Sequence, residues 1–128
     1  MNINRSQSLS GFGVSIGGIT QTISANAGGV FDDTIAANQT NLQIDLPLVD
    51  LTTCTVMAVV ADKDCTLETN SGTSPTDTLA LKANVPLSWM TGDLADNKFL
   101  SADVTAWFIT TGAAATKLKI LIASDGTP

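Results

Sequence analysis

The chain offers few of the side chains that catalysis usually needs. It has no histidine and no tyrosine, and Glu68 is the only glutamate among its 128 residues. Histidine is the usual general base near neutral pH and the commonest metal ligand, so a serine or cysteine nucleophile would have to recruit an unusual base. The sequence therefore predicts a protein without enzymatic activity.

Two pairs of aspartates, Asp62 with Asp64 and Asp32 with Asp33, could supply oxygen ligands to a calcium ion. A calcium loop normally brings several carboxylates to one point, whereas Asp62 and Asp64 flank a lysine. Aspartate is also a favoured turn residue, and two cysteines are too few for a structural zinc site. We expect solvated turns at these aspartates, with no metal and no other cofactor.

Cys54 and Cys65 are candidates for a disulfide. If the chain makes a hairpin that turns at Lys63, Cys54 pairs near Gly72 instead of near Cys65. The two Cα atoms would then lie beyond the limit of about 7 Å for a disulfide. We expect both cysteines to be free and buried, acting as small hydrophobic residues.

Trp89 and Trp107 are the most prominent candidate binding residues, because exposed aromatic rings can stack on sugars. Trp107 lies in an apolar run beside Phe108, which favours the core or an interface. Trp89 follows a strand end, where large aromatic side chains commonly cover the edge of a core. The candidate interface residues are Trp89, Trp107, Phe12 and Ile16.

Composition excludes several classes of partner. The net charge is −6, and six scattered basic residues are outnumbered by twelve acidic ones. The chain therefore has no basic stripe for nucleic acid and no charge that would attract it to anionic lipid. The longest apolar run, at residues 56–61, is far shorter than the roughly 20 residues of a membrane-spanning helix. The N-terminus leads into Ser, Gly and Gln, so we also expect no secretory signal.

Short strands separated by turns account for most of the chain. Residues 41–48, 78–85 and 117–122 alternate apolar and polar side chains, which is typical of half-buried strands. Pro47 predicts that the first of these lies at a sheet edge or ends in a bulge. In the second, we expect Leu79, Leu81, Ala83 and Val85 to face one way.

Two runs, 56–61 and 107–109, are apolar on both faces. This pattern indicates central strands covered on each side, or strands whose outer face meets another chain. We expect one hairpin around Gly17-Gly18, a second between 56–61 and 65–69, and room for one helical turn at 91–99.

About eight such strands predict an all-β fold, a single antiparallel β-sandwich of jelly-roll type at residues 25–128. Residues 1–24 carry more Ser and Gly and fewer large apolar side chains. We expect them to form an N-terminal arm or edge hairpin that becomes ordered against a neighbour.

The low charge conflicts with this strand pattern. Monomeric β proteins usually protect their edge strands with lysine, proline or inward-pointing charges. Here six cations and four prolines serve about eight strands, several of them apolar on both sides. Apolar outer faces mark interaction surfaces, so we expect the chain to work within an assembly.

Four runs of the chain resemble small virion proteins of tailed bacteriophages, in particular head-decoration (cement) proteins. They are ADKDCTLETN at 61–70, PTDTLAL at 75–81, VPLSW at 85–89 and ASDGTP at 123–128. The resemblance implies a non-enzymatic protein that is made in the host cytoplasm and localised in the virion. It implies the major capsid protein as partner and a homo-oligomer, such as a trimer. It assigns no catalytic or binding residues.

Three functions remain open at this stage. The favoured one is a capsid decoration protein that stabilises the phage head through subunit contacts. A tail or neck component of the virion would use the same physics elsewhere on the particle. A receptor- or glycan-binding module would depend on Trp89, Trp107 and the Thr/Asn-rich loops.

Overall fold

The computed structural model describes residues 2–11, 14–24, 27–45, 49–91 and 100–124, which form ten strands and no helix. All strand pairs are antiparallel. The strands are β1 (Asn2–Gly11), β2 (Val14–Ser24), β3 (Ala27–Ile35), β4 (Leu42–Ile44), β5 (Cys54–Ala61), β6 (Cys65–Thr69), β7 (Thr78–Leu81), β8 (Leu87–Met90), β9 (Trp107–Thr111) and β10 (Thr116–Ser124).

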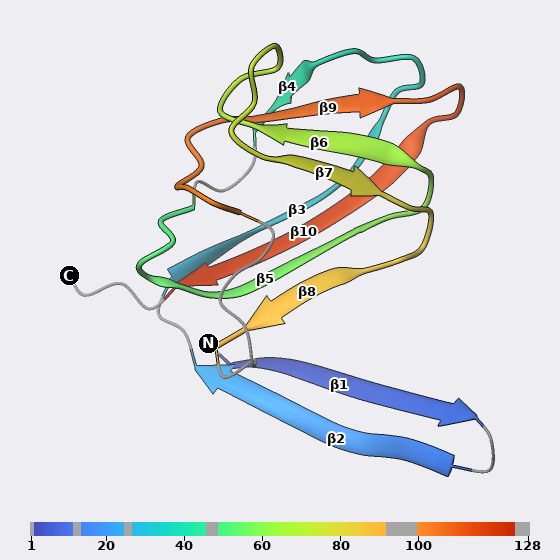
Figure 1. The fold of residues 1–128 in the computed structure, drawn as a ribbon, viewed down its shortest axis with the longest axis vertical. Helices are drawn as coiled ribbons and strands as arrows, with labels where there is room; N and C mark the ends of the chain where they lie inside the picture. Colours follow the sequence, from blue (N-terminus) through green and yellow to red (C-terminus); the bar gives the residue numbers. More distant parts are fainter. Residues whose placement is uncertain (1, 12–13, 25–26, 46–48, 92–99, 125–128) are drawn as a thin grey trace.

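Strands β3 to β10 form a jelly-roll sandwich of two four-stranded sheets (Figure 1). One sheet has the order β3-β10-β5-β8 and the other β4-β9-β6-β7. Counted from β3, these orders are 1-8-3-6 and 2-7-4-5, the arrangement of two interlocked Greek keys. The structure therefore confirms the predicted all-β sandwich of jelly-roll type with eight strands.

The core lies between the two sheets, where the inward positions of the strands meet. Trp107 and Ile109 from β9, Met57 from β5 and Leu118 and Ile120 from β10 are essentially inaccessible to solvent and belong to one cluster. Burying a large apolar side chain contributes about 1.5–3 kcal/mol, so these central strands supply much of the stability. The central positions predicted for 56–61 and 107–109 are confirmed.

The predicted hairpin between 56–61 and 65–69 is wrong. β5 and β6 belong to different sheets, so the connection at 62–64 crosses from one layer of the sandwich to the other. The backbone N–H of Asp62 still donates to the carbonyl of Lys117 on β10, at 3.1 Å, before the chain leaves the sheet. In the sequence, a short charged segment between two apolar runs looks the same whether it closes a hairpin within one sheet or crosses between two sheets.

Glycines 17 and 18 do not form the predicted turn either. They lie inside β2, opposite the register shift between Gln7 and Leu9 of β1. Such a shift is a β-bulge, and glycine tolerates the backbone bend that a bulge requires. The hairpin at the N-terminus is instead β1 with β2, joined through residues 12–13, which lie outside the described residues.

The predicted strand 78–85 is shorter than expected. β7 ends at Leu81, and Asn84 has a φ of 60°, so the chain turns there. Leu79 and Leu81 are buried as predicted, whereas Val85 is 52% exposed. β4 lies at a sheet edge as predicted, although Pro47 lies outside the described residues, as do residues 92–99 of the expected helical turn.

Cys54 and Cys65 are free and buried, as predicted, but for a different geometric reason. Cys54 begins β5 and Cys65 follows its end, so the eight-residue length of β5 separates them by about 25 Å. Burial raises the pKa of both thiols. The pKa of Cys65 rises to about 11, with the charges of Asp64 and Asp62 adding to the effect of burial.

One asparagine fastens the connections at one end of the sandwich. Asn70 has a φ of 69°, and its side-chain amide donates to Thr76 Oγ1 (3.1 Å) and to the Asp103 carbonyl (3.0 Å). Its Oδ1 accepts the backbone N–H (2.8 Å) and the hydroxyl (3.1 Å) of Thr105. The β6–β7 and β8–β9 connections are therefore tied through a single side chain.

We expect Asn70→Ala to lower the free energy of unfolding by about 3 kcal/mol, because it removes these hydrogen bonds and leaves alanine in a left-handed conformation. Asn84→Ala is the matched control. Its φ is 60°, and its exposed side chain makes no hydrogen bond within the described residues. The substitution should therefore lower the free energy of unfolding only by the cost of placing alanine in a left-handed conformation, about 1 kcal/mol. Urea unfolding measures both values, and equal losses would contradict the role of the Asn70 network.

The Cys65 thiol predicts a loss of stability at alkaline pH. An unfolded thiol deprotonates near its ordinary pKa of 9.0, whereas the folded one holds its proton to about 11. The unfolded state therefore releases this proton first, and the free energy of unfolding falls as pH rises from 9 to 11. Urea unfolding across this window should show a weaker pH dependence for Cys65→Ala than for the wild type. Identical pH dependence in both proteins would show that Cys65 does not contribute.

Candidate assembly surface

The two sheets present different outer faces. The outward positions of the β4-β9-β6-β7 sheet are mostly polar: Gln43, Thr66, Glu68, Thr78, Ala80, Phe108 and Thr110. The outward positions of β5 and β10 in the other sheet are mostly apolar: Val56, Ala58, Val60, Lys117, Lys119, Leu121 and Ala123. The expected apolar outer face is thus present on β5, whereas β9 carries only Phe108 beside Thr110.

A shallow apolar groove of about 170 Å³ crosses the outer face of the β3-β10-β5-β8 sheet. Its walls include Val30 from β3, Leu121 from β10, Ala58 and Val60 from β5, and Pro86 before β8. Val30 is 71% exposed, the highest value among the exposed large hydrophobic residues that the structure describes. We call this surface, defined by these five residues, the apolar groove.

The same outer face also holds a small buried cluster. Val56, Met90 and Ala123 are almost completely buried, and Leu121 packs against them. These residues point away from the main core, because their strand neighbours Met57 and Ile122 face the other sheet. The apolar groove therefore continues, through Leu121, into apolar structure that is already closed to solvent.

The sheet edges are better protected than the sequence indicated. Among the described strands, β4 has three residues and β7 and β8 have four each, and short edge strands offer little for another chain to pair with. β3 differs, because it spans nine residues with only one neighbour, β10. Within the two four-stranded sheets, the expectation of unprotected edges therefore applies to β3 alone, while β1 and β2 have one neighbour each in their separate two-stranded sheet.

The N-terminal hairpin is a separate two-stranded ribbon, which lies on the β8 side of the molecule in Figure 1. Its register runs from Asn2 opposite Ser24 to Gly11 opposite Val14, with one shift between Gln7 and Leu9. Because an isolated two-stranded hairpin is at best marginally stable in water, such a ribbon gains stability by packing against another surface.

The structure does not gather the four candidate interface residues at one place. Trp107 is 0% exposed in the core, so it is closed both to a partner and to a stacked sugar. Trp89 lies in β8, partly buried, and pairs with Met57 in the row that faces the core. Ile16 lies in β2, and Phe12 falls outside the described residues.

Sequence reasoning missed Val30 and Leu121 as members of the surface. The available signal was alternation: Val56, Ala58 and Val60 stand on one side of β5, and their partners on β10 and β3 must share that side. That inference needs the order of strands in the sheet, which local patterns do not contain.

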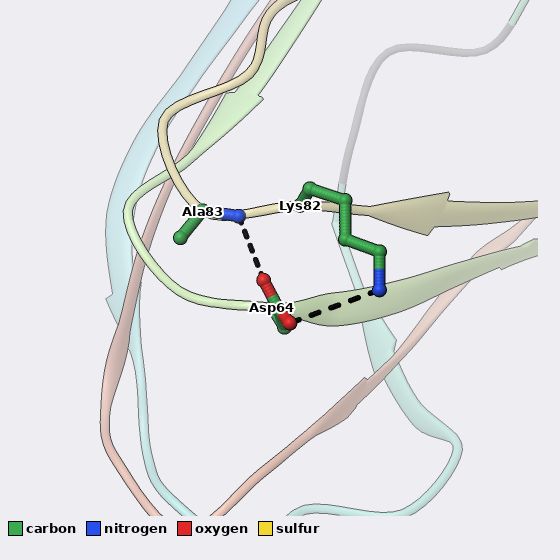
Figure 2. A network of polar contacts seen from close by, with 3 residues as sticks. All are labelled: Asp64, Lys82 and Ala83. Atoms are coloured by element: carbon green, nitrogen blue, oxygen red, sulfur yellow. Dashed lines mark hydrogen bonds and ion pairs between the residues drawn. The ribbon is translucent and has the colours of Figure 1, made fainter.

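Asp62 and Asp64 lie in a connection between strands, as expected, and accept backbone N–H groups. Asp32 and Asp33 lie inside β3, so the turn expected there is wrong. Asp64 Oδ1 accepts the N–H of Ala83 at 2.8 Å, and its other oxygen lies 3.8 Å from Lys82 Nζ (Figure 2). Asp62 Oδ1 accepts the N–H of Lys117 at 2.8 Å. Within the described residues, no three cysteine or acidic side chains are grouped as metal ligands would be.

Two other hollows, each of about 290 Å³, lie at the ends of the sandwich. The first contains Asp50 and Asp103, and both carboxylates already accept local hydrogen bonds, from Thr52 and from the N–H of Leu51. The hydrogen bonds from Thr52 hold the pKa of Asp50 below its ordinary value. Both acids are therefore arranged to fix loops, and the lowered pKa makes Asp50 poorly suited to acid–base chemistry near neutral pH.

No helix in the described part of the chain is long and apolar enough to cross a membrane. Comparisons with models of protein families, with curated proteins and with solved structures find no match. The surface features of the fold are therefore the basis for a functional proposal.

Proposed function

We propose that the chain is a non-enzymatic structural protein of a bacteriophage virion, a decoration or cement protein of the head. It binds the major capsid protein through the outer face of the β3-β10-β5-β8 sheet and stabilises the shell by those contacts. The observation that carries this proposal is the one-sided surface, with an apolar groove on one sheet and a polar coat on the other.

The fold supports this function by analogy. Jelly rolls recur in viral capsid proteins, and also in lectins and cupins, so topology alone does not decide between these roles. The chain has no histidine for metal chemistry, and Trp107 is buried where a sugar-binding platform would need it exposed. Among the roles that jelly rolls serve, a subunit of a shell fits the available side chains best.

The apolar groove has the character of a contact surface. Its floor is formed by central strands, whose backbone is already paired, so the surface is rigid before a partner arrives. Partial exposure of Ala58, Val60 and Leu121 means that a partner would remove apolar area from water without the sandwich having to open. Burial of that area favours association by about 25 cal/mol per Å².

The first test uses Val60→Glu and phage heads assembled without the chain. We expect wild-type protein to sediment with these heads and Val60→Glu to bind at least about tenfold more weakly, since binding would remove water from a carboxylate, a cost that pairing with Lys119 offsets only in part. Lys119 lies opposite Val60 in the sheet, so the new carboxylate has a cation beside it in the free protein.

Thr66→Glu is the control. It places the same charge on the outer face of a central strand in the other sheet, and it should bind as the wild type does. Failure of the wild type to bind heads would refute the proposal. Binding to the neck or tail of complete particles would show instead that the protein is a component of that part of the virion. Equal weakening by both variants would show that the apolar groove is not the contact surface.

The hairpin gives a second test. Among the described strands, β1 and β2 pair only with each other and with no strand of the sandwich, so removal of residues 1–24 should change the melting temperature by less than about 5 °C. The same deletion should weaken binding to the heads, because the hairpin, which we propose to contact neighbouring subunits, is then lost. Calorimetry and co-sedimentation measure the two effects. A large fall in melting temperature would show instead that the hairpin is an integral part of the sandwich.

A further inference from the structure

Among the described strands, β3 has β10 as its one neighbour, and its opposite edge is available to a second strand over only part of its length. At the C-terminal end of the strand, Asp33 Oδ1 accepts the backbone N–H of Thr34 at 2.7 Å. A local side chain thus occupies a backbone donor that a second strand would otherwise use. Toward the N-terminus, Gly29 and Val30 carry no side chain able to do this.

The directions of the β3 amides follow from its neighbours. The carbonyl of Lys117 on β10 accepts from Asp62, beyond the end of β5, so odd-numbered residues of β10 direct their backbone groups toward β5. Even-numbered residues of β10 therefore direct their backbone groups toward β3. Their hydrogen-bonded partners on β3 are odd-numbered, such as Phe31 opposite Ile120. Since the register has no shift, Gly28, Val30 and Asp32 direct their N–H and C=O groups outward.

These directions limit how two copies of β3 can pair about a two-fold axis. Hydrogen-bonded pairs form between outward-directed residues, and the axis can pass through such a pair or lie between two of them. With the axis at Gly29, Phe31 or Asp33, at most two hydrogen-bonded pairs within β3 avoid the blocked donor of Thr34, whereas an axis at Val30 gives three. The axes that pass through an outward-directed residue are at Gly28, Val30, Asp32 and Thr34. Thr34 is blocked by Asp33, and an axis at Asp32 places two carboxylates directly opposite each other. An axis at Gly28 aligns only the first residues of each strand.

An axis at Val30 meets none of these objections. It pairs Val30 with the same residue of the second copy and places Asp32 opposite Gly28, so each carboxylate faces a residue without charge. Gly29 then lies opposite Phe31. The acidic and uncharged halves of the strand are complementary to each other when the second copy runs antiparallel.

We infer that this chain forms a two-fold dimer in which two β3 strands pair antiparallel, centred on Val30, to join two four-stranded sheets into one of eight strands. The inference deepens the proposed function, on which it rests, by naming a second copy of the chain as one partner. In the dimer the outward row of Ala58, Leu121 and Val30 continues across the axis. The two apolar grooves then form one continuous surface.

The decisive variant is Val30→Lys. Val30 is 71% exposed, so the substitution leaves the fold intact, but it sets two ammonium groups against each other at the axis. We expect the dimer of the wild type to weaken at least tenfold in sedimentation equilibrium. Val85→Lys is the matched control, because Val85 is also an exposed valine and lies in the β7–β8 connection, outside β3. It should leave the dimer unchanged.

Cross-linking tests the register. The Cα atoms of two paired residues at the axis lie about 5.5 Å apart, which suits a disulfide. The two Asp32 positions lie four residues apart along the strands, about 13 Å, which does not. Mild oxidation should therefore link Val30→Cys into dimers and leave Asp32→Cys monomeric. Wild-type protein is the blank, since both native cysteines are buried.

A wild type that stays monomeric at every concentration would overturn the dimer, as would a dimer or trimer that Val30→Lys leaves intact. Linking of Asp32→Cys in place of Val30→Cys would overturn the register. None of these results bears on binding to phage heads, which the Val60→Glu comparison measures separately. Conversely, a dimer with this register in a protein that ignores phage heads would leave the pairing established and refute the proposed function.

Discussion

Each sheet of a jelly roll has two faces, and the sandwich buries only one of them. The other properties of the molecule depend on the side chains of its two outer faces. The outer face of the β4-β9-β6-β7 sheet carries threonine, glutamine and glutamate, which water solvates well. The outer face of the β3-β10-β5-β8 sheet carries valine, alanine and leucine, with two lysines of β10 between them. The fold therefore has a side made for water and a side suited to contact.

The polar groups of the chain are occupied with holding the loops. Asn70 ties two connections together, Asp64 fixes the turn before β8, and Asp62 fixes the start of β10. A carboxylate that accepts a backbone N–H fixes the position of that backbone. The feature that these polar side chains leave free is the apolar outer face of the β3-β10-β5-β8 sheet.

The free edge of β3 and the apolar groove belong to the same sheet, and this connection joins the two proposals. A sheet can be extended only along its edge, and β3 is the one long edge strand of the described sandwich. Extension there adds a second groove in line with the first. Apolar area grows in this way without a change in either sandwich, so a shell protein would present a larger contact surface at little cost in conformational entropy.

Alternation along single strands was enough to predict the class of fold and the half-buried strand at 117–122, and an unbroken apolar run was enough to predict the central strand at 56–61. These are properties of a strand by itself, because side chains two residues apart share a face wherever the strand lies. Tertiary structure alone decided that residues 62–64 cross between sheets, that Trp107 is buried, and that Val30 stands beside Leu121 on an open face. Each of these depends on pairing between strands distant in sequence, such as β10 with β3. The pattern of side chains along one strand does not indicate which other strand it pairs with.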